Sequence, residues 1–167
     1  MIFIKSKEEI EIMRRGGQIL ARVLSEVAVE VRAGVNLKKL DNLAEKLILG
    51  SDARPSFKGY KPTGANKAYP AALCVSLNHE VVHGVPDDRI IKEGDVVGLD
   101  LGVFYEGFHT DGAVTIGVGQ ISETTQKLIA VTKESLDLAI QMITPGVYWG
   151  DVAYEIKKFV EDNKFSV

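Results

Sequence analysis

The chain contains one cysteine, Cys74, and no run of apolar residues long enough to cross a membrane. A lone cysteine excludes an internal disulfide framework and is typical of proteins in a reducing compartment. A membrane span needs about 20 apolar residues. The apolar start, residues 1–4, runs directly into charged residues and is too short for a secretory signal. We therefore expect a cytoplasmic protein with no membrane partner.

Positive charge is not in excess, because 20 Lys and Arg residues stand against 23 Asp and Glu residues, a formal net charge of −3. This balance excludes the electrostatic footprint of a nucleic-acid-binding protein. The sequence also lacks the Gly-x-Ser-x-Gly motif of serine hydrolases, and residues 117–119 lack the third glycine of a dinucleotide-binding loop. We expect no nucleic-acid partner and no chemistry of these two kinds.

The sequence does contain enough apolar residues, 46%, for one core, so we expect residues 1–167 to form a single domain. Ser6 and Glu9 have the spacing of a capping box before a helix that Gly34 ends. Apolar periodicity predicts further helices over 37–49, 122–143 and 148–163. It predicts strands over 71–77, 96–104 and 108–118, an extended segment at 81–86, and the start of another strand at 165–167. The expected fold class is α+β.

The segment 96–111, VVGLDLGVFYEGFHTD, predicts a β-hairpin that brings two aspartates together. A turn centred between Tyr105 and Glu106 would place Asp100 directly opposite Asp111, with Cβ atoms about 5 Å apart on one face. Two ionised carboxylates at ~5 Å repel by roughly 3 kcal/mol at an effective dielectric of about 20. A structure that keeps them together must offset this repulsion.

Three interpretations of the aspartate pair remain open at this point. A divalent cation held by both carboxylates would remove the repulsion, since hard oxygen ligands suit such ions. A proton shared between the carboxyl groups is the second possibility. In the third, the register differs by one residue and the two side chains lie on opposite faces.

Three other side chains are candidates for chemistry, each with an ordinary structural alternative. His83 lies before Pro86 in an extended segment, and it is either a site residue beside the hairpin or a loop residue bonded to backbone. His109 shares a face with Asp111, and we favour a packing or hydrogen-bonding role for it. Cys74 lies in the middle of a strand, where a small buried apolar side chain is the ordinary interpretation.

Residues 74–86, CVSLNHEVVHGVP, resemble the signature of type I methionine aminopeptidases of metallopeptidase family M24. Residues 93–102, EGDVVGLDLG, and 106–111, EGFHTD, continue the resemblance, and residues 8–21 are similar to the opening helix of that family. The resemblance implies a pita-bread fold, in which helices pack on the outer face of an antiparallel sheet. It also implies metal-assisted removal of the N-terminal methionine from nascent proteins near the ribosome, by a monomeric enzyme.

The resemblance also implies roles for individual residues. Asp100 and Asp111 match ligands of two divalent metal ions, which in the family can be Co, Mn, Fe or Zn. His83 matches a catalytic histidine that contacts the substrate near the scissile amide. Residues that match the walls of the methionine pocket are Tyr60, Tyr69 and Cys74.

The sequence departs from the family pattern in two ways. Thr110 and Gly112-Ala113 replace the residues that usually flank the second aspartate, which removes a hydroxyl group near Asp111. The family takes a histidine and two glutamates as further ligands from later strands, which this chain does not supply. We therefore expect a truncated pita-bread domain, with its second half incomplete and its C-terminal strands lacking, that binds metal weakly at most and is not a competent peptidase alone.

Two alternative functions are a non-catalytic pita-bread-like binding module and a related proline-specific peptidase. The retained pair Asp100 and Asp111 counts against a decayed site, which has no reason to keep two repelling carboxylates. The segment VVHGVP at 81–86 counts against the proline-specific peptidase. An incomplete sheet would also leave an open strand edge and exposed apolar side chains, so we expect the chain to self-associate.

Overall fold

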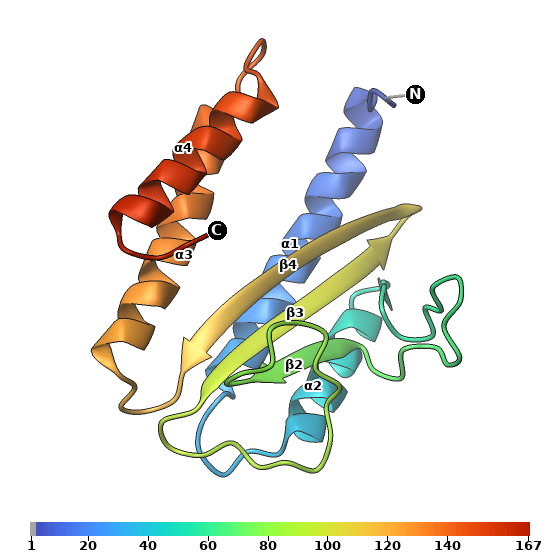
Figure 1. The fold of residues 1–167 in the computed structure, drawn as a ribbon. Helices are drawn as coiled ribbons and strands as arrows, with labels where there is room; N and C mark the ends of the chain where they lie inside the picture. The colour runs from blue at the N-terminus through green and yellow to red at the C-terminus, as the bar shows by residue number, and fades with distance from the viewer. Residues whose placement is uncertain (1–2) are drawn as a thin grey trace. The chain divides into compact units, whose positions relative to one another are not determined.

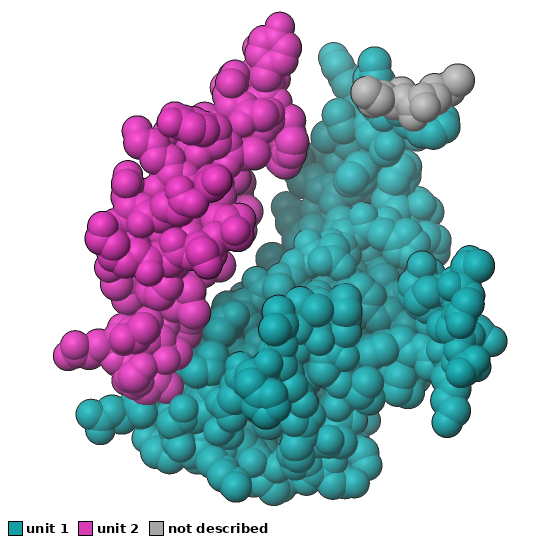
Figure 2. All heavy atoms as spheres, in the orientation of Figure 1, with its two compact units in different colours: residues 1–120 teal, residues 121–167 magenta. Residues whose placement is uncertain are grey.

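The computed structural model describes residues 3–167, and the chain divides between Gln120 and Ile121 into two compact units (Figures 1 and 2). The first unit contains two helices and all four strands. The second unit contains two helices and no strand.

Helix α1, Lys7–Val29, begins at the capping box that the sequence predicts. The Ser6 hydroxyl accepts a hydrogen bond from the Glu9 amide at 3.2 Å, and the Glu9 carboxylate accepts one from the Ser6 amide at 2.7 Å. The helix ends at Val29 rather than near Gly34, so the predicted end is wrong. The Gly34 amide instead donates to the Ile91 carbonyl at 2.8 Å, which commits this segment to a loop contact.

Helix α2, Leu37–Leu49, has the predicted bounds, with Asn36 capping its start. Asp41 on this helix fixes the beginning of a strand, because its Oδ1 accepts hydrogen bonds from the amides of Ala72 and Leu73 at 2.8 and 3.0 Å. These hydrogen bonds join α2 to the start of the strand that carries Cys74.

The sheet is built around one long strand, β3, Val96–Tyr105. Strand β4, Phe108–Gly117, runs antiparallel along its whole length. Strand β2, Leu73–Leu77, pairs with the first half of β3, and the two-residue strand β1, Arg54–Pro55, pairs with its last half. The sequence predicts three of these strands and misses β1, which is too short for a periodic pattern.

The two faces of the sheet have different characters, as the alternation of side chains along β3 shows. Its apolar residues, Val97, Leu99, Leu101 and Val103, are fully buried in the core with residues of α1 and α2. Helix α1 packs against β3 and β4, and α2 against β1 and β2 (Figure 1). The even-numbered positions, which include Asp100, project to the other face. That face carries the candidate site.

The second unit is a pair of packed helices, α3, Glu123–Met142, and α4, Trp149–Asp162. Both match their predicted bounds within a residue or so. The apolar side chains Leu128, Leu136 and Tyr154 are 46%, 60% and 63% exposed. A helix that packs against one partner helix buries one narrow stripe, so apolar side chains outside that stripe remain exposed.

Residues 165–167, expected to begin a strand, are not in a strand here. The Phe165 amide donates to the Val160 carbonyl at 3.1 Å, and the Lys127 ammonium lies 5.8 Å from the centre of the Phe165 ring. These contacts turn the segment back onto its own helices. Across the described residues, no helix has the length and apolar character needed to cross a membrane.

Candidate functional site

The β3–β4 turn sets the register of the two aspartates, and it lies one residue later than the sequence suggests. Glu106 and Gly107 form a two-residue turn with φ values of 44° and 91°, so Tyr105 pairs with Phe108. Two positive φ angles are typical of the type I′ turn, whose twist suits a hairpin. Consequently Asp100 lies opposite Ala113, and the predicted direct pairing with Asp111 is wrong.

Asp100 and Asp111 nevertheless project to the same face of the sheet. Asp111 lies opposite Gly102, two residues along β3 from Asp100, so the two aspartates are diagonal neighbours. The register differs from the predicted one by two residues, and because side chains alternate with a period of two, this difference preserves the face. Diagonal neighbours remain within reach of each other's side chains.

The carboxyl group of Asp100 lies in an unfavourable environment for an anion. Its Oδ1 atom is buried and has no hydrogen-bond partner among the described residues. Burial raises the pKa of Asp100 above its ordinary value, and the negative charge of Asp111 raises it further, while His83 acts in the opposite direction. A buried acceptor without a donor costs free energy unless another group satisfies it.

Strand β2 and the loop after it bring two further side chains to Asp100. Cys74 lies directly opposite Asp100 on the neighbouring strand. The sulfur of Cys74, a ring nitrogen of His83 and a carboxylate oxygen of Asp100 all lie within 4.8 Å of one another. The predicted site residues His83, Cys74 and Asp100 are therefore together, and Asp111 lies outside this group of three.

The segment that presents His83 is not a regular extended strand, contrary to the expectation for residues 81–86. His83 has φ +60°, a conformation that residues other than glycine rarely adopt, and such strain is often found at functional sites. Gly84 beside it donates to the Ser76 hydroxyl at 3.2 Å, and its carbonyl accepts from the Val75 amide at 2.9 Å. Strand β2 thus holds the histidine in place through its neighbour.

An ion-paired clamp closes the base of the loop that carries His83. Arg89 donates to Glu80 at 2.6 Å and to Asp87 at 2.9 Å. The other oxygen of Glu80 accepts from the Leu77 amide at 2.8 Å. These bonds hold the pKa of Glu80 and of Asp87 below their ordinary values. The clamp joins the two ends of the loop while its tip remains exposed.

An aromatic wall stands beside the same face of the sheet. Tyr69 is half-buried, and its hydroxyl donates to the carbonyl oxygens of Leu73 and Gly84 at 3.2 and 3.0 Å. The ring of Phe57 meets the ring of Tyr69 edge to face, with 6.5 Å between centroids. Burial raises the pKa of Cys74, so its thiol stays protonated at neutral pH and suits an apolar wall better than metal ligation.

Phe57 is a site residue that the sequence reasoning missed. A Cβ on Gly102 would lie only 2.8 Å from the Phe57 ring and from Ser56, so the missing side chain allows this segment to lie against the sheet. The Ser56 amide donates to the Gly102 carbonyl at 2.9 Å. A glycine inside a strand is a signal that another backbone approaches closely, and Gly102 carried that signal.

The remaining candidates have peripheral places. His109 accepts or donates a hydrogen bond with the Ser56 hydroxyl at 2.9 Å and stacks at a tilt on Phe104, with 4.6 Å between centroids. This confirms the packing and hydrogen-bonding role that we favoured, and Phe104 is also its cross-strand neighbour on β3. Tyr60 is 63% exposed, and its carbonyl accepts one backbone hydrogen bond from the Tyr69 amide at 2.8 Å.

The donor set fits a divalent cation. The buried Oδ1 of Asp100 has no hydrogen-bond donor among the described residues, and the carboxylate of Asp111 projects from the same face. A cation would satisfy the orphaned oxygen and would also offset the repulsion between the two carboxylates. Asp100 and Asp111 would hold such an ion, with His83 close to Asp100.

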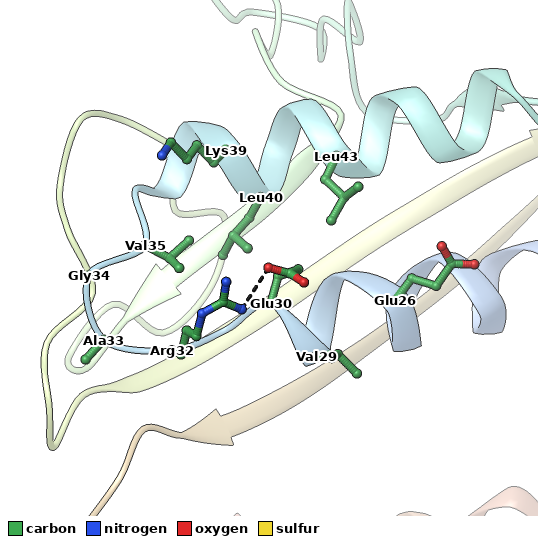
Figure 3. A pocket seen from close by; sticks show the side chains of 10 residues that line it. All are labelled: Glu26, Val29, Glu30, Arg32, Ala33, Gly34, Val35, Lys39, Leu40 and Leu43. Carbon is green, nitrogen blue, oxygen red and sulfur yellow. Dashed lines mark hydrogen bonds and ion pairs between the residues drawn. The ribbon is translucent and has the colours of Figure 1, made fainter.

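A separate hollow of about 840 Å³ lies between the end of α1 and the beginning of α2 (Figure 3). Its walls carry charges of both signs, among them Arg32 and Glu30, which form an ion pair at 2.8 Å. None of the candidate site residues lines it. We therefore do not assign it to the chemistry of the aspartate pair.

Comparison with known proteins connects this site to a family. The model of metallopeptidase family M24 matches residues 11–167. The chain is 42% identical to the methionine aminopeptidase of Clostridium perfringens over 167 residues, which are all of this chain and 65% of that protein. It is 39% identical to methionine aminopeptidase 1 of Bacillus subtilis over the same shares of the two chains. The chain thus spans about 65% of the length of these relatives.

Solved structures give the same result. The methionine aminopeptidase of Rickettsia prowazekii aligns with a TM-score of 0.93 at 30% identity, covering 100% of this chain and 65% of that one. The methionine aminopeptidase of Thermotoga maritima aligns with a TM-score of 0.90 at 40% identity, covering 97% and 63%. The X-Pro aminopeptidase of Thermotoga maritima, at 20% identity and a TM-score of 0.77 over 96% and 42%, shares the fold alone.

Proposed function

Because the chain belongs to metallopeptidase family M24, we propose that it is the metal-binding part of an aminopeptidase that removes N-terminal methionine from peptides. The solved relatives confirm the expected α+β, pita-bread type of fold. The relatives that carry the name methionine aminopeptidase are longer than this chain. We therefore also propose, for this chain, their activity, their substrate and their partners. Nascent polypeptides in the cytoplasm are the proposed substrates.

One observation supports the proposal most strongly. The buried Oδ1 of Asp100 has no hydrogen-bond partner among the described residues, and Asp111 projects from the same face. A structural role for Asp100 would supply a donor to that oxygen. A cation-binding role explains both the missing donor and the second carboxylate.

The chain's own residues would divide the work as follows. Asp100 and Asp111 would hold one or two divalent cations, which when bound provide a Lewis acid for peptide hydrolysis. His83, exposed on the strained loop beside Asp100, would hydrogen-bond the substrate near the scissile amide. The Arg89 clamp would hold the two ends of the loop that carries this histidine, without contacting the substrate.

The apolar wall would select the first residue of the substrate. Phe57, Tyr69 and Cys74 offer aromatic and sulfur surfaces beside the aspartates. Such surfaces suit the flexible thioether of methionine, because sulfur–aromatic contacts are favourable. Tyr60 contributes least to this wall, because its side chain is mostly exposed.

We further propose that residues 1–167 alone bind metal weakly and do not turn over substrate. Two carboxylates and one nearby histidine leave most of the coordination of a cation to water. We also propose that the complete enzyme uses two divalent metal ions, which can be Co, Mn, Fe or Zn. A non-catalytic binding module is the alternative, and it predicts that no addition of protein ligands restores hydrolysis.

A chimera tests the function. Residues 1–167 would be joined to the C-terminal third of the Clostridium perfringens relative, and methionine release from a Met-Ala-Ser peptide would be followed with added Mn²⁺ or Co²⁺. We expect turnover that falls at least ~100-fold when Asp111 is changed to Asn, because the substitution removes a metal-binding charge. Asp137→Asn, on the exposed surface of α3, is the matched control and should leave the rate unchanged.

A folded chimera that binds metal and releases no methionine would contradict the proposed function and support the binding module. Turnover by the 167-residue chain alone, lost on Asp111→Asn, would contradict only the proposal that this chain is not competent. Cleavage confined to peptides with proline in second place would support the proline-specific alternative.

A further inference from the structure

The segment that forms the aromatic wall has an unusual charge. Residues 53–79 contain four basic side chains, Arg54, Lys58, Lys61 and Lys67, and no aspartate or glutamate. The whole chain has a net charge of −3, so the charge of this segment is opposite in sign to the net charge of the chain. Part of the segment, residues 61–68, forms a loop that projects from the sheet after α2 (Figure 1).

The base of this loop is fixed by backbone hydrogen bonds between its two ends. The Gly59 amide donates to the Tyr69 carbonyl at 2.8 Å, and the Tyr69 amide donates to the Tyr60 carbonyl at 2.8 Å. Within the loop, the Ala65 amide donates to the Pro62 carbonyl at 3.0 Å. The loop is therefore a closed excursion with a defined base.

The base of the loop is also part of the candidate site. Tyr69, which closes it, donates its hydroxyl hydrogen bond to the Gly84 carbonyl, next to His83. Phe57, just before the base, lies against Gly102, which is directly opposite Asp111. The wall and the loop are thus joined at Tyr69, and a peptide bound with its first residue against this wall would begin at the base of the loop.

Two lysines of the loop have charge available for such a peptide. Lys58 is neutralised, because its ammonium lies 2.7 Å from both carboxylate oxygens of Glu45. Lys61 and Lys67 are exposed and form no ion pair or side-chain hydrogen bond with any residue from 3 to 167. Unpaired lysines on a loop attract acidic side chains of an approaching ligand.

We propose that Lys61 and Lys67 recognise acidic side chains of the substrate beyond its second residue, so that peptides with acidic residues in the third to fifth positions are preferred. This specificity rests on the proposed function, since it concerns the same bound peptide. A nucleic-acid ligand is the less favoured occupant, because two unpaired lysines offer few phosphate contacts and the chain is acidic overall.

A binding experiment tests the proposal without requiring turnover. Two peptides labelled at the C-terminus, Met-Ala-Ser-Glu-Glu-Gly and Met-Ala-Ser-Gln-Gln-Gly, would be titrated with the 167-residue chain in Mn²⁺ buffer at low salt, by fluorescence anisotropy. We expect the Glu peptide to bind about threefold to tenfold more tightly than the Gln peptide, the range for two exposed ion pairs. The double variant Lys61→Gln, Lys67→Gln should abolish the difference, and 0.5 M salt should reduce it.

The matched control is Lys157→Gln, Lys158→Gln, which removes two exposed lysines from α4 and should leave the difference intact. Equal binding of the two peptides, absence of binding, or a difference that survives the Lys61 and Lys67 substitutions would overturn the proposal. Tighter binding of an RNA oligonucleotide than of the Glu peptide, lost in the same double variant, would overturn it in favour of nucleic acid. Failure of the proposed function would give a different result. Peptides in which Gly replaces the first Met would then bind as tightly as the Met peptides, both in the Glu series and in the Gln series.

Discussion

At the scale of single residues, Gly84 determines where His83 lies. A Cβ at this position would overlap the carbonyl oxygen of Val75 on strand β2. The close approach allows the Val75 amide to bond the Gly84 carbonyl, and it brings the strained His83 beside Asp100. The geometry of the site thus depends on the absence of one methyl group.

We predict that Gly84→Ala lowers the free energy of unfolding by about 2 kcal/mol or more, because the loop must move away from β2. Urea denaturation followed by circular dichroism would measure the change. Gly17→Ala is the control, since a Cβ there meets nothing within 4 Å and alanine favours the helix, so it should be neutral or stabilising. A Gly84→Ala chain as stable as the parent chain would show that the loop has room to adjust.

Some features of the site can be predicted from the sequence, and others cannot. The shared face of Asp100 and Asp111 is predictable, because it depends only on the parity of their separation across a tight turn. Their exact register is not, because it depends on Glu106 adopting a positive φ. Phe57 is not visible either, since its contact with Gly102 joins segments 45 residues apart that no local pattern connects.

At the scale of elements, the capping box at Ser6 predicts where α1 begins, and the apolar spacing predicts where the other helices run. Ser6, Asn36 and Ser122 all cap helices in the structure. The end of α1 and the short strand β1 were missed, because both depend on hydrogen bonds to distant residues such as Ile91 and Phe104. Local propensity does not contain that information.

The α1–sheet contact offers a matched pair of positions. A Cβ on Gly16 would lie 3.4 Å from Thr110 on β4 and 3.6 Å from Tyr105 on β3, whereas one on Gly17 meets nothing within 4 Å. We predict that Gly16→Leu destabilises the chain by about 1–3 kcal/mol, because the larger side chain must enter a packed contact. Gly17→Leu should change stability by less than about 0.5 kcal/mol, and equal effects of the two substitutions would contradict the packing.

The loop clamp predicts a dependence on pH. The hydrogen bonds from Arg89 and the Leu77 amide lower the pKa of Glu80 below its ordinary value of 4.5 in the folded chain. A carboxylate with a lowered folded-state pKa contributes stability above its unfolded pKa and loses it as the pH falls through the folded value. The contribution should therefore be present at pH 7 and should decline below about pH 4.5.

Glu80→Gln tests this dependence. We expect it to lower the free energy of unfolding by about 1 kcal/mol at pH 7, a value reduced from that of a buried pair because Arg89 is partly exposed. The difference from the parent chain should shrink toward zero at pH 3. Glu134→Gln, on the exposed side of α3, should have no effect at either pH. A difference that stays constant from pH 7 to pH 3 would contradict the ionic clamp.

At the scale of the whole molecule, the second unit exposes several large apolar side chains. Leu136, Ile140, Tyr148 and Trp149 are each at least 60% exposed. Large exposed apolar patches promote association. We predict concentration-dependent self-association of the 167-residue chain in sedimentation velocity experiments, reduced by Leu136→Lys together with Ile140→Lys. A monomer at high concentration would contradict this prediction.

The proposed function requires that Asp100 and Asp111 bind one cation together. Titration of the 167-residue chain with Mn²⁺, followed by electron paramagnetic resonance of the free ion, measures this most directly. We predict weak binding that Asp100→Asn and Asp111→Asn each weaken by about tenfold or more, while Asp137→Asn leaves it unchanged. Binding that is unaffected by Asp111→Asn would contradict the account, because it would mean that the two carboxylates do not share an ion.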